Sequence, residues 1–389
     1  MPVLNRAAEL HDEVAGWRRH IHAHPELGFE LPQTANFVAD RLREFGCDQV
    51  ETGVGQSGIV AVIRGSRGEG PAIGLRADMD ALPIVETSGA GHASGTRGIM
   101  HACGHDGHTA MLLGAAKYLA ETRNFAGTCV LIFQPAEEIG QGAKAMIGDG
   151  MLERFGIERV FGMHNLPGLK EGTFAIKPAG IMGSVSRFTL KVKGVGGHAA
   201  RPNVTVDPIV VASQIILALQ TIVSRNTDPV SPVVVSVTSI AAGTAFNIIP
   251  EQAEMLGTVR TLEAAQVEQT RAAIERVTRG IATAHGATVA FEFDNPASVT
   301  FNHSAETDLA AQVAADVAGE TGIDREARPV LAGEDFSHML VARPGALIFI
   351  GNGKSAGLHH PAYDFNDAII PQGISYWVRL TEAALKPAS

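Results

Sequence analysis

The chain has 389 residues, of which 45% are hydrophobic and 19% are charged, and its formal net charge is −10. This length allows two domains, or one large domain with an insertion, and the composition is that of a globular protein with a substantial core. The negative charge and the lack of any run of basic residues exclude nucleic acid as an expected partner, because phosphate binding requires clustered Lys and Arg.

The sequence predicts neither a membrane span nor a disulfide framework. Its longest apolar stretch, residues 209–223, is interrupted by a serine and two glutamines and is too short to cross a bilayer. Residues 1–17 contain acidic side chains and no continuous apolar segment, so we expect no signal peptide. The three cysteines are widely spaced, unlike those of a disulfide framework. We therefore expect a cytoplasmic protein without a membrane partner.

The first part of the chain alternates helical patterns with short apolar strands. Such strands, separated by helices, are typical of a mixed sheet that is covered by helices on both faces. Ligands of these sheets bind beyond the carboxyl ends of the strands. The expected helices cover residues 4–20, 33–45 and 109–122, and the expected strands cover 58–63, 72–77, 128–133 and 159–163.

After residue 181 the pattern changes to strand, helix, strand, strand, helix, strand, and it ends near residue 296. This order is that of a ferredoxin-like α+β domain. We therefore predict an α/β protein, in which a mixed-sheet domain (residues 1–181 and 297–389) is interrupted by a smaller ferredoxin-like domain (residues 182–296). The last part of the chain predicts a helix at 308–318, a strand at 346–350 and a helix at 372–385.

Residues 101–108, HACGHDGH, place three imidazoles, a thiol and a carboxylate in eight positions. Folding does not require this density of soft and borderline ligands, which indicates a metal site. The alternative is a tight turn into the next helix, with the histidines capping the helix or exposed. Three other histidines, His20, His22 and His24, lie at a helix end where nothing nearby completes a site, so we expect them to be exposed or hydrogen-bonded.

Further ligand-type side chains follow three of the predicted strands. Asp78 and Asp80 follow the second strand, Glu137 and Glu138 follow the third, and His164 follows the fourth. Neighbouring residues of an extended segment point in opposite directions, so one glutamate can bind a metal while the other reaches a water molecule. Turn capping by the aspartates and a surface glutamate pair are the alternatives. Side chains that converge at one edge of the sheet would suit a two-metal site.

Several motifs, in this order along the chain, resemble the group of di-metal amidohydrolases that contains aminoacylases, hippurate hydrolases and indole-acetyl-amino-acid hydrolases. The resemblance extends over nearly the whole chain. It is carried by RRH (18–20) with HPE (24–26), RADMDALP (76–83), HACGHDGH (101–108), FQPAEE (133–138), GMHN (162–165), GHA (197–199), NIIP (247–250) and LH (358–359).

This resemblance implies that the mixed-sheet domain is the catalytic domain and that it holds two divalent metal ions per subunit. Manganese and zinc suit the implied ligands best, and cobalt and nickel also suit them. Glu137 is implied as the general base, which takes a proton from metal-activated water and later gives it to the leaving amine. Asp80 is implied to hold a ligand imidazole in its tautomer. The implied metal ligands are Cys103, which bridges the two ions, and His105, Glu138, His164 and His359.

The resemblance further implies that the inserted domain is a lid that also forms a homodimer. His198 would stabilise the oxyanion of the tetrahedral intermediate, and in dimeric relatives this histidine comes from the partner subunit. Asn247 and Arg260 match lid positions that could hold the substrate carboxylate, for which Arg offers a bidentate fork.

We accordingly expect hydrolysis of the amide bond of N-acyl-L-amino acids, either hippurate-like or N-acetylated, to a carboxylic acid and a free amino acid. A dipeptidase of the same family is the alternative, because an acyl group and an amino-terminal residue would occupy the same pocket. A Cys103 nucleophile is disfavoured, since it leaves the glutamates and the other histidines without roles. A metal-binding protein without activity would not need Glu137.

Overall fold

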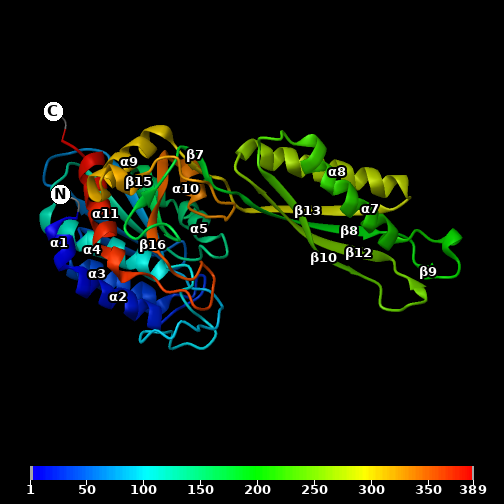
Figure 1. Ribbon diagram of the computed structural model, residues 1–389, viewed down its shortest axis with the longest axis horizontal. Coiled ribbons are helices and arrows are strands. Elements are labelled where there is room, and N and C mark those ends of the chain that lie inside the picture. Colours follow the sequence, from blue (N-terminus) through cyan, green and yellow to red (C-terminus); the bar gives the residue numbers. More distant parts are fainter. Residues whose placement is uncertain (1–2, 388–389) are drawn as a thin grey trace. The chain divides into compact units, whose positions relative to one another are not determined.

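The computed structural model describes residues 3–387 and divides into two compact units (Figure 1). The first unit comprises the chain up to Ile181, the segment Phe301–Arg328 and the chain from Asp335 onward. The second comprises Met182–Thr300 and the short segment Pro329–Glu334. The sequence placed the return to the first unit after residue 296 and gave no sign that 329–334 would belong with the second.

An eight-stranded mixed sheet forms the centre of the first unit, with the order β1-β2-β4-β3-β5-β16-β6-β15. The neighbours β4, β3, β5 and β16 are parallel, so their carboxyl ends meet at one edge. The prediction of a mixed sheet with helices is confirmed. The strands are β1 (Gln49–Val54), β2 (Gly58–Arg64), β3 (Ala72–Asp78), β4 (Thr128–Gln134), β5 (Ile157–Pro167), β6 (Phe174–Ala175), β15 (Ile323–Asp324) and β16 (Gly345–Gly353).

Helices cover both faces of this sheet. On β3, Leu75 and Ala77 belong to the apolar core that includes the helix α4 (His105–Thr122). Arg76 points to the opposite face by strand alternation, where Phe336, just before α10 (Ser337–Ala342), lies under its guanidinium. The other helices are α1 (Asn5–Glu9), α2 (His11–Ala23), α3 (Pro32–Glu44), α5 (Gly142–Gly148), α6 (Met151–Arg154), α9 (Ser304–Ala318) and α11 (Ile370–Ala384).

The helix predicted at 4–20 is two helices, α1 and α2, that meet at Leu10. The backbone there stays close to helical, with Leu10 N–H donating to Arg6 O and Val14 N–H donating to Leu10 O, so the apolar periodicity passes through the break. Helix α2 continues to Ala23 and ends at His24, because Pro25 disfavours the helical conformation at the residue before it.

The second unit is a four-stranded antiparallel sheet with α7 and α8 on one face (Figure 1). The chain runs β8, α7, β10, β12, α8, β13, and the sheet order is β10-β12-β8-β13. Both orders are those of the predicted ferredoxin-like arrangement. The elements are β8 (Val185–Lys193), α7 (Pro208–Thr221), β10 (Val233–Ala242), β12 (Gln252–Thr261), α8 (Ala264–Ala284) and β13 (Thr288–Ala297), with the two-stranded pair β9 (Gly197–His198)–β11 (Ile248–Ile249). A further two-stranded pair, β7 (Ala179–Met182)–β14 (Thr300–Asn302), contains the residues at which the chain leaves and re-enters the first unit, and most of its residues belong to that unit.

Among the described residues, one helix, Pro208–Asn226, is long and apolar enough to cross a membrane, although the sequence had indicated a stretch too short to do so. It consists of α7 and the π turn that follows it. One such helix is weak evidence for a span, and this one packs Val211, Ile215 and Leu219 into the core of the second unit. Only 33% of it is buried, so much of its apolar surface faces away from that core.

Candidate active site

The predicted metal ligands come from four places at the edge where the parallel strands end. Cys103 lies in the loop before α4, and His105 is the first residue of that helix. Glu138 follows β4, and His164 lies near the end of β5. His359 follows β16 with a left-handed backbone, φ 62°.

Two groups of potential ligand atoms share Cys103. One contains Cys103, His105 and His164, and the other contains Cys103, Glu138 and His359; within each group the atoms lie within 4.8 Å of one another. The Cys103 Sγ to His164 Nε2 distance is 3.6 Å, and the His359 Nε2 to Glu138 Oε2 distance is 3.5 Å. Such spacings suit donors that each lie about 2.0–2.3 Å from a common ion. The structure thus brings together all five predicted ligands around a shared thiol.

Hydrogen bonds orient the two buried imidazoles toward this centre. His105 Nδ1 donates to the backbone oxygen of Asp80 at 2.8 Å, and His164 Nδ1 donates to the backbone oxygen of Asn165 at 2.7 Å. Each Nε2 is thereby left as the metal-binding nitrogen. His105 Nε2 and Glu138 Oε1 are buried and have no hydrogen-bond partner within residues 3–387. Buried polar atoms are rarely left unpaired, so this donor set fits metal ions.

Burial shifts the pKa values of the thiol and the carboxylate away from the charged forms that bind metal, whereas it keeps the His164 imidazole in the neutral form that binds metal. Burial raises the pKa of Glu138 to about 7 and that of the Cys103 thiol well above its usual value, and the Glu138 charge adds to the effect on Cys103. Burial also lowers the pKa of His164 to about 3, which keeps this imidazole neutral. Divalent cations would offset the cost of a buried thiolate and carboxylate.

The turn that carries the two glutamates is held by Asp80. Asp80 Oδ1 accepts the backbone N–H of Glu137 at 3.0 Å, and Oδ2 accepts that of Glu138 at 3.1 Å. The preceding residue, Ala136, is buried with a left-handed φ of 55°, a strained backbone that the surrounding bonds maintain. The role expected for Asp80 is partly corrected, because its carboxylate is occupied by these two amides. Its backbone oxygen, and not the carboxylate, holds the His105 imidazole.

A second set of buried side chains, outside the implied ligand set, fixes the backbone of Cys103. His108 Nδ1 donates to Asp78 Oδ1 at 2.6 Å, and His108 Nε2 accepts the backbone N–H of Asn165 at 2.9 Å. The Asn165 amide donates to Cys103 O at 2.7 Å and accepts from the Tyr363 hydroxyl at 2.8 Å. His108 lies in the histidine-rich motif that indicated a metal site, but no pattern pointed to Tyr363.

Gly104, between two of the ligands, can only be glycine. Its φ is 90°, a conformation that other residues rarely adopt. A Cβ at this position would also lie 2.3 Å from Asn165 Nδ2 and 2.6 Å from the Tyr363 hydroxyl. The glycine therefore allows the chain to pass against the Asn165 network between Cys103 and His105.

Comparison with known proteins decides the family. Residues 74–383 match the family described as peptidase family M20/M25/M40. The chain belongs to this family. It is 41% identical over 386 residues to a hippurate hydrolase of Campylobacter jejuni, covering 99% of this chain and 100% of that protein. It is 38% identical over 378 residues to an N-acetylcysteine deacetylase of Bacillus subtilis, covering 97% and 98%.

Among solved structures, a Bacillus subtilis protein described as a dinuclear metal binding peptidase from the M20 family superposes with a TM-score of 0.87. The two sequences are 35% identical, and the match covers 98% of this chain and 100% of that one. The resemblance stated from the motifs is therefore confirmed, as is the prediction of an enzyme of the amide-hydrolase class. The structure also contains a candidate metal centre, and the Bacillus subtilis protein is described as binding a dinuclear metal centre.

The histidines near the amino terminus do not form a metal group in the described part of this M20 chain. His20 and His24 are exposed, whereas His22 is buried and donates from Nδ1 to Asp106 Oδ2 at 2.8 Å. Its Nε2 lies 3.2 Å from Glu86 Oε1. Burial alone would lower the pKa of His22, but the charge and hydrogen bond of Asp106, with help from Glu86, raise it to about 9.

The predicted residues of the second unit lie on exposed parts of that unit. His198 is exposed on β9, opposite Ile248 of β11, and Asn247 O accepts the backbone N–H of Ala199 at 3.0 Å. Phe246, the neighbour of Asn247, is 99% exposed. The β9–β11 ribbon therefore presents His198, Phe246 and Asn247 together.

Arg260 is not near this ribbon. It is half-buried close to the end of β12, where the neighbouring Thr261 O accepts the N–H of Ser184, shortly after the chain enters the second unit. Asn247 instead precedes the start of β12 at Gln252, and the two ends of this strand are about 30 Å apart. Asn247 and Arg260 of one copy therefore cannot hold the same carboxylate.

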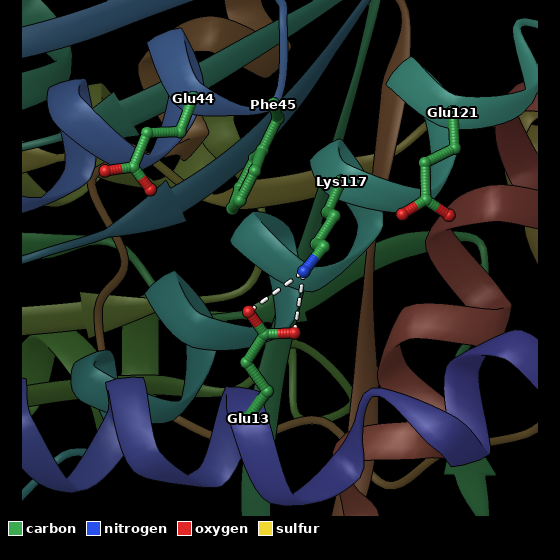
Figure 2. A pocket seen from close by; sticks show the side chains of 5 residues that line it. All are labelled: Glu13, Glu44, Phe45, Lys117 and Glu121. Carbon is green, nitrogen blue, oxygen red and sulfur yellow. Dashed lines mark hydrogen bonds and ion pairs between the residues drawn. The ribbon is translucent and has the colours of Figure 1, made fainter.

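A surface hollow of the first unit offers no comparable chemistry. Figure 2 shows it between α2, α3 and α4, lined by Glu13, Glu44, Phe45, Lys117 and Glu121. Lys117 Nζ is bound by both carboxylate oxygens of Glu13, at 2.9 and 2.7 Å, so its charge is already paired. The hollow lies about 18 Å along α4 from the metal-ligand end.

Proposed function

We propose that this M20 protein hydrolyses the amide bond of N-acyl-L-amino acids, hippurate-like or N-acetylated, to a carboxylic acid and a free amino acid. The observation that carries the proposal is the pair of donor groups that share Cys103, with Glu137 beside them. The names of the two relatives, a hippurate hydrolase and an N-acetylcysteine deacetylase, support this substrate class.

Cys103, His105, Glu138, His164 and His359 would hold two divalent ions, with the thiolate between them. We propose manganese or zinc as the ions, and cobalt and nickel are also compatible with this set of S, N and O ligands, since affinity alone does not decide which metal a protein holds. When bound, the ions would supply positive charge that polarises the amide carbonyl and lowers the pKa of a water molecule.

Glu137 acts as the general base in this proposal. It neighbours a metal ligand in sequence, and its backbone is fixed by Asp80. Its Oε2 lies 4.0 Å from His105 Nε2, so this oxygen faces the donor groups. It would accept a proton from the attacking water and return the proton to the nitrogen of the leaving amino acid.

His198 would stabilise the oxyanion and Asn247 would hold the substrate carboxylate, both from a second copy of the chain in a homodimer. Their ribbon lies beyond the end of β8, about 30 Å along the sheet from the residues at which the chain enters the second unit. Arg260, near that entry, would come from the other copy. The exposed apolar side chains of the helix at 208–226 support a dimer surface: Ile209, Val210, Leu217 and Val223. We place the enzyme in the cytoplasm.

The test is the release of free amino acids from a panel of N-acyl amino acids and dipeptides, hippurate among them. The enzyme is stripped with a chelator and resupplied with single metals. Release that depends on metal and favours N-acyl amino acids is the expected result. Faster release from dipeptides would favour the dipeptidase alternative. Release that resists the chelator but stops on thiol alkylation would contradict the proposal and make Cys103 a nucleophile.

A further inference from the structure

A buried polar cluster lies behind the glutamate turn and has no part in the mechanism proposed above. It joins Arg76 of β3, Gln134 at the end of β4 and Asp335 just before α10. Arg76 Nε donates to Gln134 Oε1 at 2.9 Å. Gln134 Nε2 and Arg76 Nη2 donate to Asp335 Oδ1 at 2.6 and 3.2 Å. All three side chains are at most 2% exposed.

The other carboxylate oxygen of Asp335 is also occupied. Asp335 Oδ2 accepts the backbone N–H of Ala143, in the first turn of α5, at 3.0 Å. Three donors from three different elements therefore fix this one carboxylate. The result is a segment held in place against β3, β4 and α5 at the edge where the active site lies.

The backbone of Asp335 contacts the proposed base. Its N–H donates to Glu137 Oε1 at 3.3 Å, whereas Glu137 Oε2 is the oxygen that lies 4.0 Å from His105 Nε2. The two oxygens of the Glu137 carboxylate are thus distinguished. One is held by the Asp335 segment, and the other faces the donor groups.

We propose that Asp335 is a positioning residue for Glu137. Hydrogen bonds from Arg76, Gln134 and the backbone of Ala143 hold its side chain, so that its own backbone N–H points at Glu137 Oε1. Glu137 Oε2 is thereby left directed at the reacting water. The inference rests on the proposed role of Glu137 as base. A carboxylate that can rotate on a surface turn loses much of its effect, because a displacement of about 1 Å in a catalytic group can lower the rate about a hundredfold.

The test is Asp335→Asn, which keeps size and shape. The Gln134, Arg76 and Ala143 partners of the carboxylate are all donors, so the new amide group must face one of these with a second donor and displace the segment. We expect kcat to fall about tenfold to a hundredfold, KM to stay within about twofold, and metal content to remain unchanged.

A double-mutant cycle distinguishes a loss of positioning of Glu137 from an unspecific disturbance of the active site. In a Glu137→Gln background, measured in single turnover, Asp335→Asn should change the remaining rate less than about twofold, because there is no base left to position. Gln134→Met removes the shortest hydrogen bond to Asp335 and repeats the test if Asp335→Asn does not fold. Asp367→Asn is the matched control: this carboxylate accepts from Arg18 Nε at 2.7 Å and Arg19 Nε at 2.9 Å, away from Glu137, and its loss should leave kcat unchanged.

Three results would overturn the inference: an unchanged kcat, a loss of rate explained by lost metal, or an equal loss in both backgrounds. The turnover of the Glu137→Gln variant alone tests whether Glu137 is the base. If that variant keeps the normal rate, the proposed function of Glu137 fails, whatever Asp335→Asn does.

Discussion

The metal-ligand edge of the first unit and the β9–β11 ribbon of the second unit are built in opposite ways. At the edge, Cys103 is 7% exposed and His105 is fully buried, and every backbone segment that carries a ligand is tied by hydrogen bonds to another element. On the ribbon, His198 is exposed and Phe246 is 99% exposed. The first region is arranged before any ligand arrives, at the cost of burying charge. The second leaves its polar and aromatic side chains exposed, and the Ala200 N–H donates to the exposed His198 Nδ1 at 3.0 Å.

The largest effect is expected from Cys103→Ala, which removes the atom that both donor groups share. Metal content should fall from two ions per chain toward none, and turnover should drop roughly a thousandfold or more. Metal analysis after gel filtration, with parallel assays, measures both. Cys129→Ala removes an equally buried thiol from β4, outside the donor groups, and should keep metal and activity. Full metal content in the Cys103 variant would show that the ligand set is wrong.

Glu137→Gln should separate chemistry from metal binding within the same buried edge. We expect turnover to fall about a hundredfold to ten-thousandfold, the range for loss of a general base, with both ions retained. Steady-state rates and metal content, measured on the same preparation, distinguish a general base from a metal ligand. A variant that loses its metal would move Glu137 into the ligand set.

His198→Ala tests the exposed β9–β11 ribbon. Because an oxyanion donor contributes about a hundredfold to a thousandfold in kcat, turnover should fall by roughly that factor. The free energy of unfolding should stay within about 0.5 kcal/mol, since the side chain is exposed. His285→Ala, another exposed histidine of the second unit, is the control and should retain activity. Unchanged turnover in the His198 variant would remove its proposed role.

The smallest effect concerns stability. The pKa of His22 is raised to about 9 in the folded chain, above about 6.5 in the unfolded chain, so its stabilisation is complete below pH 6.5 and is lost as the pH rises through 9. This contribution amounts to about 3 kcal/mol. Denaturant unfolding of the wild type and of His22→Gln should therefore show a difference that shrinks between pH 6.5 and 10. A difference that does not change with pH would mean that the imidazole is neutral in the folded protein.

The sequence could single out the residues that the structure groups at this edge because such residue types are rare in loops and several of them follow apolar strands. Cys103, His105 and His164 could be found in this way without knowledge of their contacts. Asp335 could not, because its importance depends on meeting β4 and α5, which are distant in the chain. An acidic pair such as Glu334 and Asp335 in a loop has too many ordinary explanations for a pattern to single out one of its members.

Strand β1 was not predicted from the sequence for a related reason. Strand β1 is largely exposed, with only Val54 buried, so it lacks the apolar run that marks its neighbours. The expectation that Asn247 and Arg260 act together came from resemblance alone, and the length of β12 separates them. Sequence patterns indicate which residues are chemically unusual, but distances between them depend on how far each strand extends.

Strand β16 pairs with β5 in parallel, residue 345 beside residue 160, and the whole second unit is synthesised between them. At 5–20 residues per second, a ribosome needs roughly 10–40 s to make that stretch. During this time β5, with His164 near its end, has an open edge able to pair with other chains. The stretch 182–300, which is continuous, can fold first. With His359 among the proposed ligands, a newborn chain would acquire its full metal complement only after residue 359 has left the ribosome, and loading with metal would be one of the last steps of its maturation.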